Sequence, residues 1–202
     1  MKRSFALLTV LILCATAAFI GQERRGGGIY NRQASTMDSS PKMFDTKEYK
    51  IRVVTIAENL VYPYCFSFLP DGSALVVESE GRLRIVKDGK LQPEAITGLP
   101  QVYYVGGQAG LMDVALHPKF AQNHLIYFTY NKPGEKGATM AIGRGKLEGN
   151  QLTEVKDVFV AEAWGKANGH LSARMAFDRE GMMYMALADH NLLEDEIGRA
   201  HV

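Results

Sequence analysis

Gly106 to Pro118, with the sequence GGQAGLMDVALHP, is the segment around which the rest of the chain is organised. Its glycines allow a backbone with positive φ to come close to a ligand or a neighbouring loop, and Gln108 is the polar side chain of this turn. The apolar run Leu111–Leu116 has the length of a buried strand. His117-Pro118 ends that run, because proline has no N–H to give to a sheet. The stretch therefore predicts a glycine-rich turn that leads into a buried strand.

Similar units of strand, turn and strand lie on both sides of this stretch. They are separated by turns such as Pro70-Asp71-Gly72 and Asp178–Gly181. The first strands of three successive rounds are about 45 to 60 residues apart, which is within or above the length of a four-stranded propeller blade. A β-sandwich would also give short strands, but the recurrence favours radial repetition. We expect strands at Ile51–Val54, Tyr64–Leu69, Ala74–Glu78, Leu83–Val86, Leu91–Leu99, Leu111–Leu116, Leu125–Tyr130, Met140–Leu147, Val155–Ala161, Arg174–Phe177 and Met183–Leu187.

Composition and charge exclude some classes of partner. The chain has 202 residues, 23 Lys and Arg against 22 Asp and Glu, and a net charge of +1. This balance gives no electrostatic reason to bind nucleic acid or an anionic membrane. The length allows one full domain or part of a larger one.

The first residues predict export. Residues 1–18 have a charged start at Lys2 and Arg3, an apolar core, and the small-residue signal Ala15-Thr16-Ala17 of a cleaved signal peptide. The alternative is an uncleaved membrane anchor. We expect residues 19–48 to be a disordered linker and the protein to be periplasmic or secreted. Cleavage would leave Cys65 as the remaining thiol, which we interpret as a small buried hydrophobic residue.

Three segments resemble the soluble quinoprotein glucose/sorbosone dehydrogenases, also called aldose sugar dehydrogenases. They are FSFLPDGSALVVESEGRLRIV at Phe66–Val86, GGQAGLMDVALHPKFAQNHLIYFTY at Gly106–Tyr130, and HLSARMAFDREGMMYMALAD at His170–Asp189. The resemblance implies an all-β, six-bladed propeller, of which residues 49–195 would form about two and a half blades. It also implies pyrroloquinoline quinone (PQQ) and calcium as cofactors, an aldose as substrate, an external electron acceptor, and a possible homodimer.

The resemblance also assigns roles to four residues. His170 matches the family's catalytic base, and imidazole is the side chain whose pKa suits removal of a hydroxyl proton near neutrality. Asp189 would orient that imidazole, Gln108 would hydrogen-bond the sugar or the quinone, and Arg174 would be structural, paired with a carboxylate. The residues alone also allow a surface histidine, a turn-capping aspartate and a glutamine that fills a tight turn. Glu78 and Glu80 carry no such role, and we interpret them as a solvated face.

The end of the chain predicts a non-native tail. Residues 197–202, IGRAHV, equal one translation of a common sequencing adapter, so we expect residues 196–202 to be foreign to the protein. By resemblance, the region that holds calcium and clamps PQQ is not in these residues, and we expect the chain as given to be inactive. The alternative to a dehydrogenase is an extracellular propeller that binds a ligand or a protein without catalysis.

Overall fold

The computed structural model describes residues 39–107, 109–165 and 173–188. Backbone contacts divide the chain into two units, residues 1–34 and residues 35–202, and every described residue belongs to the second. These residues form antiparallel sheets and one short helix, so the predicted all-β class is confirmed. The helix, α1 (Phe120–Asn123), has four residues, and no helix in the described part is long and apolar enough to span a membrane.

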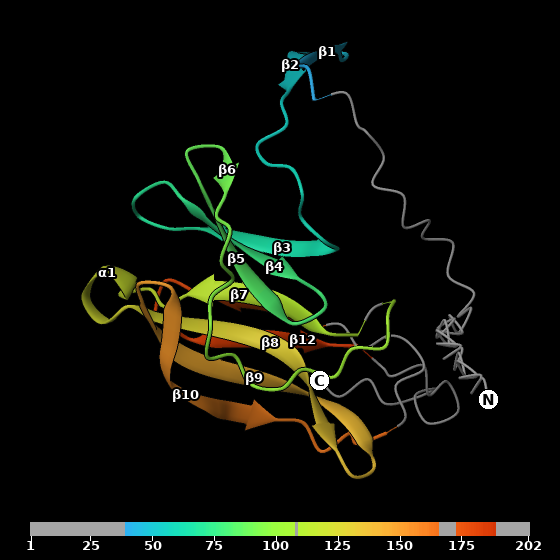
Figure 1. Ribbon diagram of the computed structural model, residues 1–202, viewed down its shortest axis with the longest axis vertical. Helices are drawn as coiled ribbons and strands as arrows, with labels where there is room; N and C mark the ends of the chain where they lie inside the picture. Colours follow the sequence, from blue (N-terminus) through green and yellow to red (C-terminus); the bar gives the residue numbers. More distant parts are fainter. Residues whose placement is uncertain (1–38, 108, 166–172, 189–202) are drawn as a thin grey trace, which may run out of the picture. The chain divides into compact units, whose positions relative to one another are not determined.

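The first sheet is a four-stranded antiparallel meander. Its order is β3 (Pro63–Phe68), β4 (Ala74–Glu78), β5 (Arg82–Lys87) and β6 (Lys90–Leu91) (Figure 1). Glycines at the three turns adopt positive φ, as tight connections between neighbouring strands require. They are Gly72, Gly81 and Gly89.

The second sheet repeats this pattern with longer strands. Its order is β7 (Leu111–Leu116), β8 (Leu125–Gly134), β9 (Gly137–Glu148) and β10 (Gln151–Val160), with α1 between β7 and β8. The loop expected at Lys132–Gly137 is instead a tight hairpin, because β8 and β9 stay paired as far as Gly134 and Gly137. The ring of Trp164 packs on Gly134, where any added Cβ would overlap it.

Two hairpins complete the described residues. β11 (Ala173–Phe177) pairs with β12 (Met183–Leu187), as the sequence predicts. β1 (Lys42–Asp45) pairs with β2 (Lys50–Val53), and both are exposed throughout. β1 therefore lies inside the segment that we expected to be disordered, because the strand predicted at Ile51–Val54 has a partner there.

The first and second sheets pack against each other through several strands of each. Side chains of the first sheet form one core with side chains of the second, whose members include Leu75, Val77, Leu83, Leu111, Val114, Phe128 and Tyr130. A second core joins the second sheet to the β11–β12 hairpin through Met112, Met140, Ala173 and Met185. β7 therefore lies between β3 and β11, and it contacts both of them.

One predicted strand is wrong. The outermost strand of the first sheet was expected at Leu91–Leu99, but β6 has two residues, and a single bridge joins Leu83 to Ile96. The physical reason is that the guanidinium of Arg84 hydrogen-bonds carbonyl groups of this segment. Its Nη2 donates to Gln92 O at 2.9 Å and to Pro93 O at 3.3 Å, and proline has no N–H for a ladder.

Candidate active site

Three of the four predicted site residues lie outside the described residues. These are Gln108, His170 and Asp189, and their roles remain predictions. The structure does describe the backbone that adjoins them, from Ala109 onward, from Ala173 onward and up to Ala188. The fourth residue, Arg174, is in β11 and is described.

The backbone two residues after Gln108 is held by a buried asparagine. Gly110 N–H donates to Asn131 Oδ1 at 2.7 Å, and Asn131 N–H donates to Gly110 O at 2.9 Å. Gly110 has a φ of +131°, and a Cβ added to it would overlap the carbonyl oxygen of Ser79. Only glycine fits this backbone, because it takes positive φ and brings no side chain to the contact. The turn that carries Gln108 is thus anchored on both the first and the second sheet.

Asp113 is a buried carboxylate that contacts three sheets. It lies in β7 beside a β-bulge, is 4% exposed, and also accepts the N–H of Val114 at 2.9 Å. Its Oδ1 accepts from Cys65 Sγ in β3 at 2.8 Å, and its Oδ2 accepts from Met175 N–H in β11 at 2.9 Å. A bulge turns a side chain away from the regular alternation of a strand, and here it allows the carboxylate to contact both β3 and β11.

Arg174 extends the same cluster. Its Nη1 lies 3.5 Å from Asp113 Oδ1 and 3.1 Å from Cys65 Sγ, and its guanidinium carbon lies 5.9 Å from the centre of the Tyr64 ring. The carboxylate partner expected for Arg174 is therefore Asp113. The side chain of Arg174 is still 60% exposed, so much of its guanidinium faces solvent.

Cys65 differs in part from its predicted role. It packs against the apolar core as predicted, but it is half-buried rather than fully buried, and its thiol also donates to a carboxylate. Burial raises the pKa of Cys65, and the hydrogen bond and negative charge of Asp113 raise it further. The thiol is therefore held protonated, as a hydrogen-bond donor.

Glu78 is also not on a solvated face, and that interpretation is wrong. It is fully buried at the end of β4, and its carboxylate accepts Val61 N–H and Arg82 Nε at 2.6 Å each. Arg84 Nη1 lies 3.4 Å from the same carboxylate. Glu80 follows in the turn, where it pairs with Arg82 at 3.3 Å. The two glutamates are therefore in different environments, because β4 ends between them.

The described residues show no side-chain cluster of the kind that holds a metal ion. Calcium takes six to eight oxygen ligands, usually with several carboxylates among them. Within the described ranges, no group of three or more His, Cys, Asp or Glu side chains is placed to hold a metal ion.

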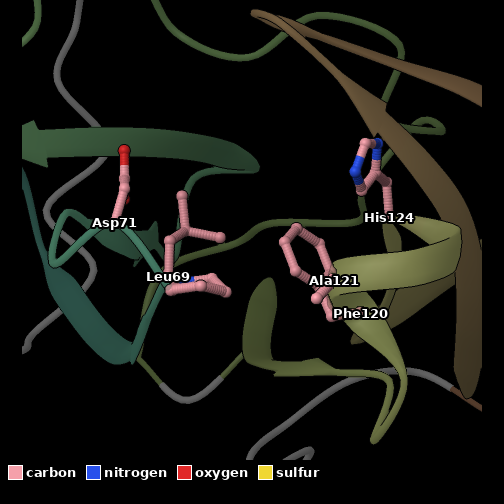
Figure 2. Close-up of a pocket in the computed structure, with 6 residues that line it drawn as sticks. Leu69, Asp71, Phe120, Ala121 and His124 are labelled. Atoms are coloured by element: carbon pink, nitrogen blue, oxygen red, sulfur yellow. The ribbon is translucent and has the colours of Figure 1, made fainter.

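A shallow hollow lies between the turn after β3 and α1 (Figure 2). Its volume is about 280 Å³, and its lining residues are Leu69, Pro70, Asp71, Phe120, Ala121 and His124. The lining is mainly apolar, and the carboxylate of Asp71 already accepts from the N–H and hydroxyl of Ser73. A sugar needs several converging hydrogen-bond partners, so the hollow does not suit one.

Comparison with known proteins identifies the family. The family model described as glucose/sorbosone dehydrogenase matches residues 60–198. The aldose sugar dehydrogenase YliI of Escherichia coli is 32% identical over 145 residues, and an uncharacterised protein of Synechocystis, slr1608, is 30% identical over 166 residues. These matches cover 70% and 79% of this chain but 39% and 40% of the relatives, so the chain spans about two fifths of their length.

Solved structures agree with the sequence matches. A glucose dehydrogenase is 36% identical with a TM-score of 0.62, over 66% of this chain and 42% of its own. The soluble aldose sugar dehydrogenase of E. coli, in its apo-form, is 32% identical with a TM-score of 0.60, over 66% of this chain and 39% of its own. The PQQ-bound aldose sugar dehydrogenase of Streptomyces coelicolor is 25% identical with a TM-score of 0.52, over 71% and 40%. This chain therefore belongs to the glucose/sorbosone dehydrogenase family of PQQ-dependent aldose sugar dehydrogenases.

Proposed function

We propose that this protein oxidises aldoses at C1 to lactones, with PQQ as the hydride acceptor and His170 as the general base. The observation that carries the proposal is the family match over residues 60–198, which spans His170, Asp189 and Gln108 together. The PQQ-bound form of a relative supports the choice of quinone. The name of the E. coli relative supports an aldose as the substrate class.

The proposed reaction removes one proton and one hydride from the sugar. PQQ, when bound, would supply the hydride acceptor, and His170 would take the proton of the C1 hydroxyl so that C1 becomes a carbonyl carbon. Asp189 orients the imidazole and stabilises its protonated form. Gln108 hydrogen-bonds the sugar or the quinone. An external electron acceptor would take up the two electrons and complete the cycle.

The described residues support this proposal through the anchors on each side of the site. A catalytic group must be held close to its productive position by its neighbours. Gly110 is fixed by Asn131 two residues after Gln108, and Ala173 and Met175 are fixed by the second sheet shortly after His170. We further propose calcium as the activating metal and export across the inner membrane, on the basis of the family and of residues 1–18.

Reduction of a redox dye tests the proposal. The product of the complete gene is supplied with PQQ, calcium and an aldose, and it is compared with its His170→Asn and His124→Asn variants. Loss of the base is expected to lower kcat by about 10² to 10⁴-fold with an unchanged far-UV spectrum. His124→Asn is the matched control, because His124 ends α1 with a φ of 55° that asparagine also tolerates.

Two outcomes would contradict the proposal. Unchanged turnover in His170→Asn would exclude His170 as the base. A wild-type protein that binds an aldose but reduces no dye would exclude the dehydrogenase and favour a non-catalytic binding propeller.

A further inference from the structure

We propose that Asp113 and Thr129 are positioning residues that fix the start of β11 on the second sheet, and with it the segment that carries His170. We call these two side chains the β11 clamp. The placement of β11 stands on the described residues alone. Its consequence for catalysis rests on the function proposed above.

The β11 clamp consists of two buried side chains on neighbouring strands. Asp113 in β7 is paired directly with Thr129 in β8. Thr129 Oγ1 donates to Ala173 O at 2.9 Å, and Asp113 Oδ2 accepts from Met175 N–H at 2.9 Å. Both side chains thus bind main-chain groups of β11 two residues apart, and neither bond depends on the identity of the residue in β11.

The polarity of the two bonds excludes a slip of β11 by one residue. The hydroxyl of Thr129 is a donor that meets a carbonyl, whereas the carboxylate of Asp113 is an acceptor that meets an N–H. A slip of β11 by one residue would also turn Ala173 and Met175 from the core to the opposite face. Both residues are buried against the second sheet, at 1% and 9% exposed. The directions of the two bonds and the burial of Ala173 and Met175 therefore both oppose a one-residue slip of β11.

The carboxylate also connects the β11 clamp to the first sheet. Asp113 Oδ1 accepts from Cys65 Sγ in β3, and Arg174 of β11 reaches the same oxygen and sulfur. Burying an ionised carboxylate is costly, and an apolar core of the same volume is often as stable. The free-energy cost of burying Asp113 is consistent with a positioning role, because this one carboxylate binds groups of β3, β7 and β11.

The consequence for the site follows from chain connectivity. Ala173 comes three residues after His170. A base that is displaced by about 1 Å can lose about 10²-fold in rate, even when the change lies away from the chemistry. Loosening of β11 is therefore expected to lower kcat more than it raises KM, since the base acts in the chemical step.

Two measurements on matched variants test the inference. Asp113→Asn keeps the shape of the side chain but replaces one of its two acceptor oxygens with an amide donor, although the groups around it are themselves donors. Thr129→Val keeps the shape of the side chain but removes the hydroxyl. Thr129→Ser restores the hydroxyl and serves as the conservative rescue. Asp157→Asn is the control, because Asp157 pairs with Tyr130 and Lys132 of the second sheet and has no bond to β11.

Amide hydrogen exchange over Ala173–Phe177 measures the β11 clamp without any catalysis. Asp113→Asn and Thr129→Val are expected to speed this exchange by about tenfold, whereas Thr129→Ser and Asp157→Asn leave it near the wild-type rate. In the dye assay, kcat is expected to fall at least tenfold in the first two variants with KM changed less, and to recover in Thr129→Ser.

The outcomes separate this inference from the function it rests on. Wild-type exchange over β11 in both Asp113→Asn and Thr129→Val would overturn the β11 clamp. Faster exchange with unchanged kcat would overturn the positioning role. A wild-type protein without dye reduction would contradict the proposed function instead, while the exchange measurement would still decide whether the β11 clamp exists.

Discussion

Cys65 is a thiol whose chemistry is suppressed by its surroundings. The thiolate is the reactive form of cysteine, and Asp113 places a negative charge 2.8 Å from the sulfur. Burial and this carboxylate both raise the pKa of Cys65, while Arg174 opposes them to a smaller extent. At neutral pH, Cys65 is therefore expected to be a structural donor and not a nucleophile.

The pH dependence of alkylation measures this directly. In a Cys14→Ser background, the rate of Cys65 alkylation is expected to reach half its maximum at a higher pH than that of a cysteine in an unfolded peptide. The raised pKa stabilises the folded state fully below the ordinary cysteine pKa, and this contribution is lost as pH rises through the folded pKa. Asp113→Asn should shift the alkylation curve to lower pH. A curve identical to that of the peptide would show that Cys65 is not held as described.

Glu78 tests the cost of an incomplete buried ion pair. Glu78→Gln keeps an acceptor for Val61 N–H but removes the charge opposite Arg82 and Arg84. The free energy of unfolding is expected to fall by about 3 kcal/mol, measured by urea denaturation. Glu80→Gln is the control, because this pair is more exposed and is expected to cost under about 1 kcal/mol. Equal losses in both variants would contradict the structure.

The sequence allows the chemistry of a residue to be predicted better than its partners. A carboxylate near Arg174 was predicted and is present. Asp113 could not be assigned, because its partners are set by packing between sheets, 48 and 62 positions away. The arginine partners of Glu78 were within reach of the sequence, because Arg82 and Arg84 lie four and six positions later across the turn at Gly81. No local pattern places the loop at Val61, 17 positions earlier, on that carboxylate.

At the scale of elements, turns explain most of the agreement between sequence and structure. β4, β7 and β12 begin and end at the predicted residues, because apolar runs are bounded there by glycine, proline or aspartate. The hairpin of β8 and β9 was predicted too short, since its turn needs only Glu135-Lys136. The long strand expected after β5 does not form, because the side chain of Arg84 in β5 binds carbonyl groups of that segment.

Gly110 gives the sharpest prediction for an element. Gly110→Ala would place a methyl group on the carbonyl oxygen of Ser79 at a φ of +131°, and we expect a loss of about 3 kcal/mol or more in the free energy of unfolding. Gly107→Ala is the matched control, because its φ is +65° and nothing lies within 4 Å of the added Cβ. The control is expected to cost about 1 kcal/mol. The result would go against the structure if Gly107→Ala were the more damaging change.

For the described molecule as a whole, the outer face of the first sheet is only partly covered, because Ala57 and Leu60 pack on Ala74, Val76 and Val86 but not over the whole of β3. Cys65 and Ser67 of β3 are half-buried, and Cys65 faces the second sheet. Phe66 and Phe68 alternate with them, are 61% and 65% exposed, and contact each other edge to face at 5.4 Å. Exposed apolar patches of this kind cause association or mark a contact with another part of a protein.

The 202-residue chain on its own is therefore expected to self-associate. Phe66→Ser with Phe68→Ser should reduce the associated fraction in size-exclusion chromatography, with little change in the midpoint of unfolding, because both rings are largely exposed. Phe128→Ser should instead lower that midpoint strongly, because Phe128 is fully buried. A chain that stays monomeric at high concentration would contradict this expectation.

The contact of Trp164 with Gly134 has an optical consequence. Trp164 is the single tryptophan of the chain, and it lies six residues before His170. All intrinsic indole emission therefore originates beside the tip of the β8–β9 hairpin, from a ring seated on a glycine. The wavelength and intensity of that emission report on the segment that precedes the proposed base, without an added dye or a mutation.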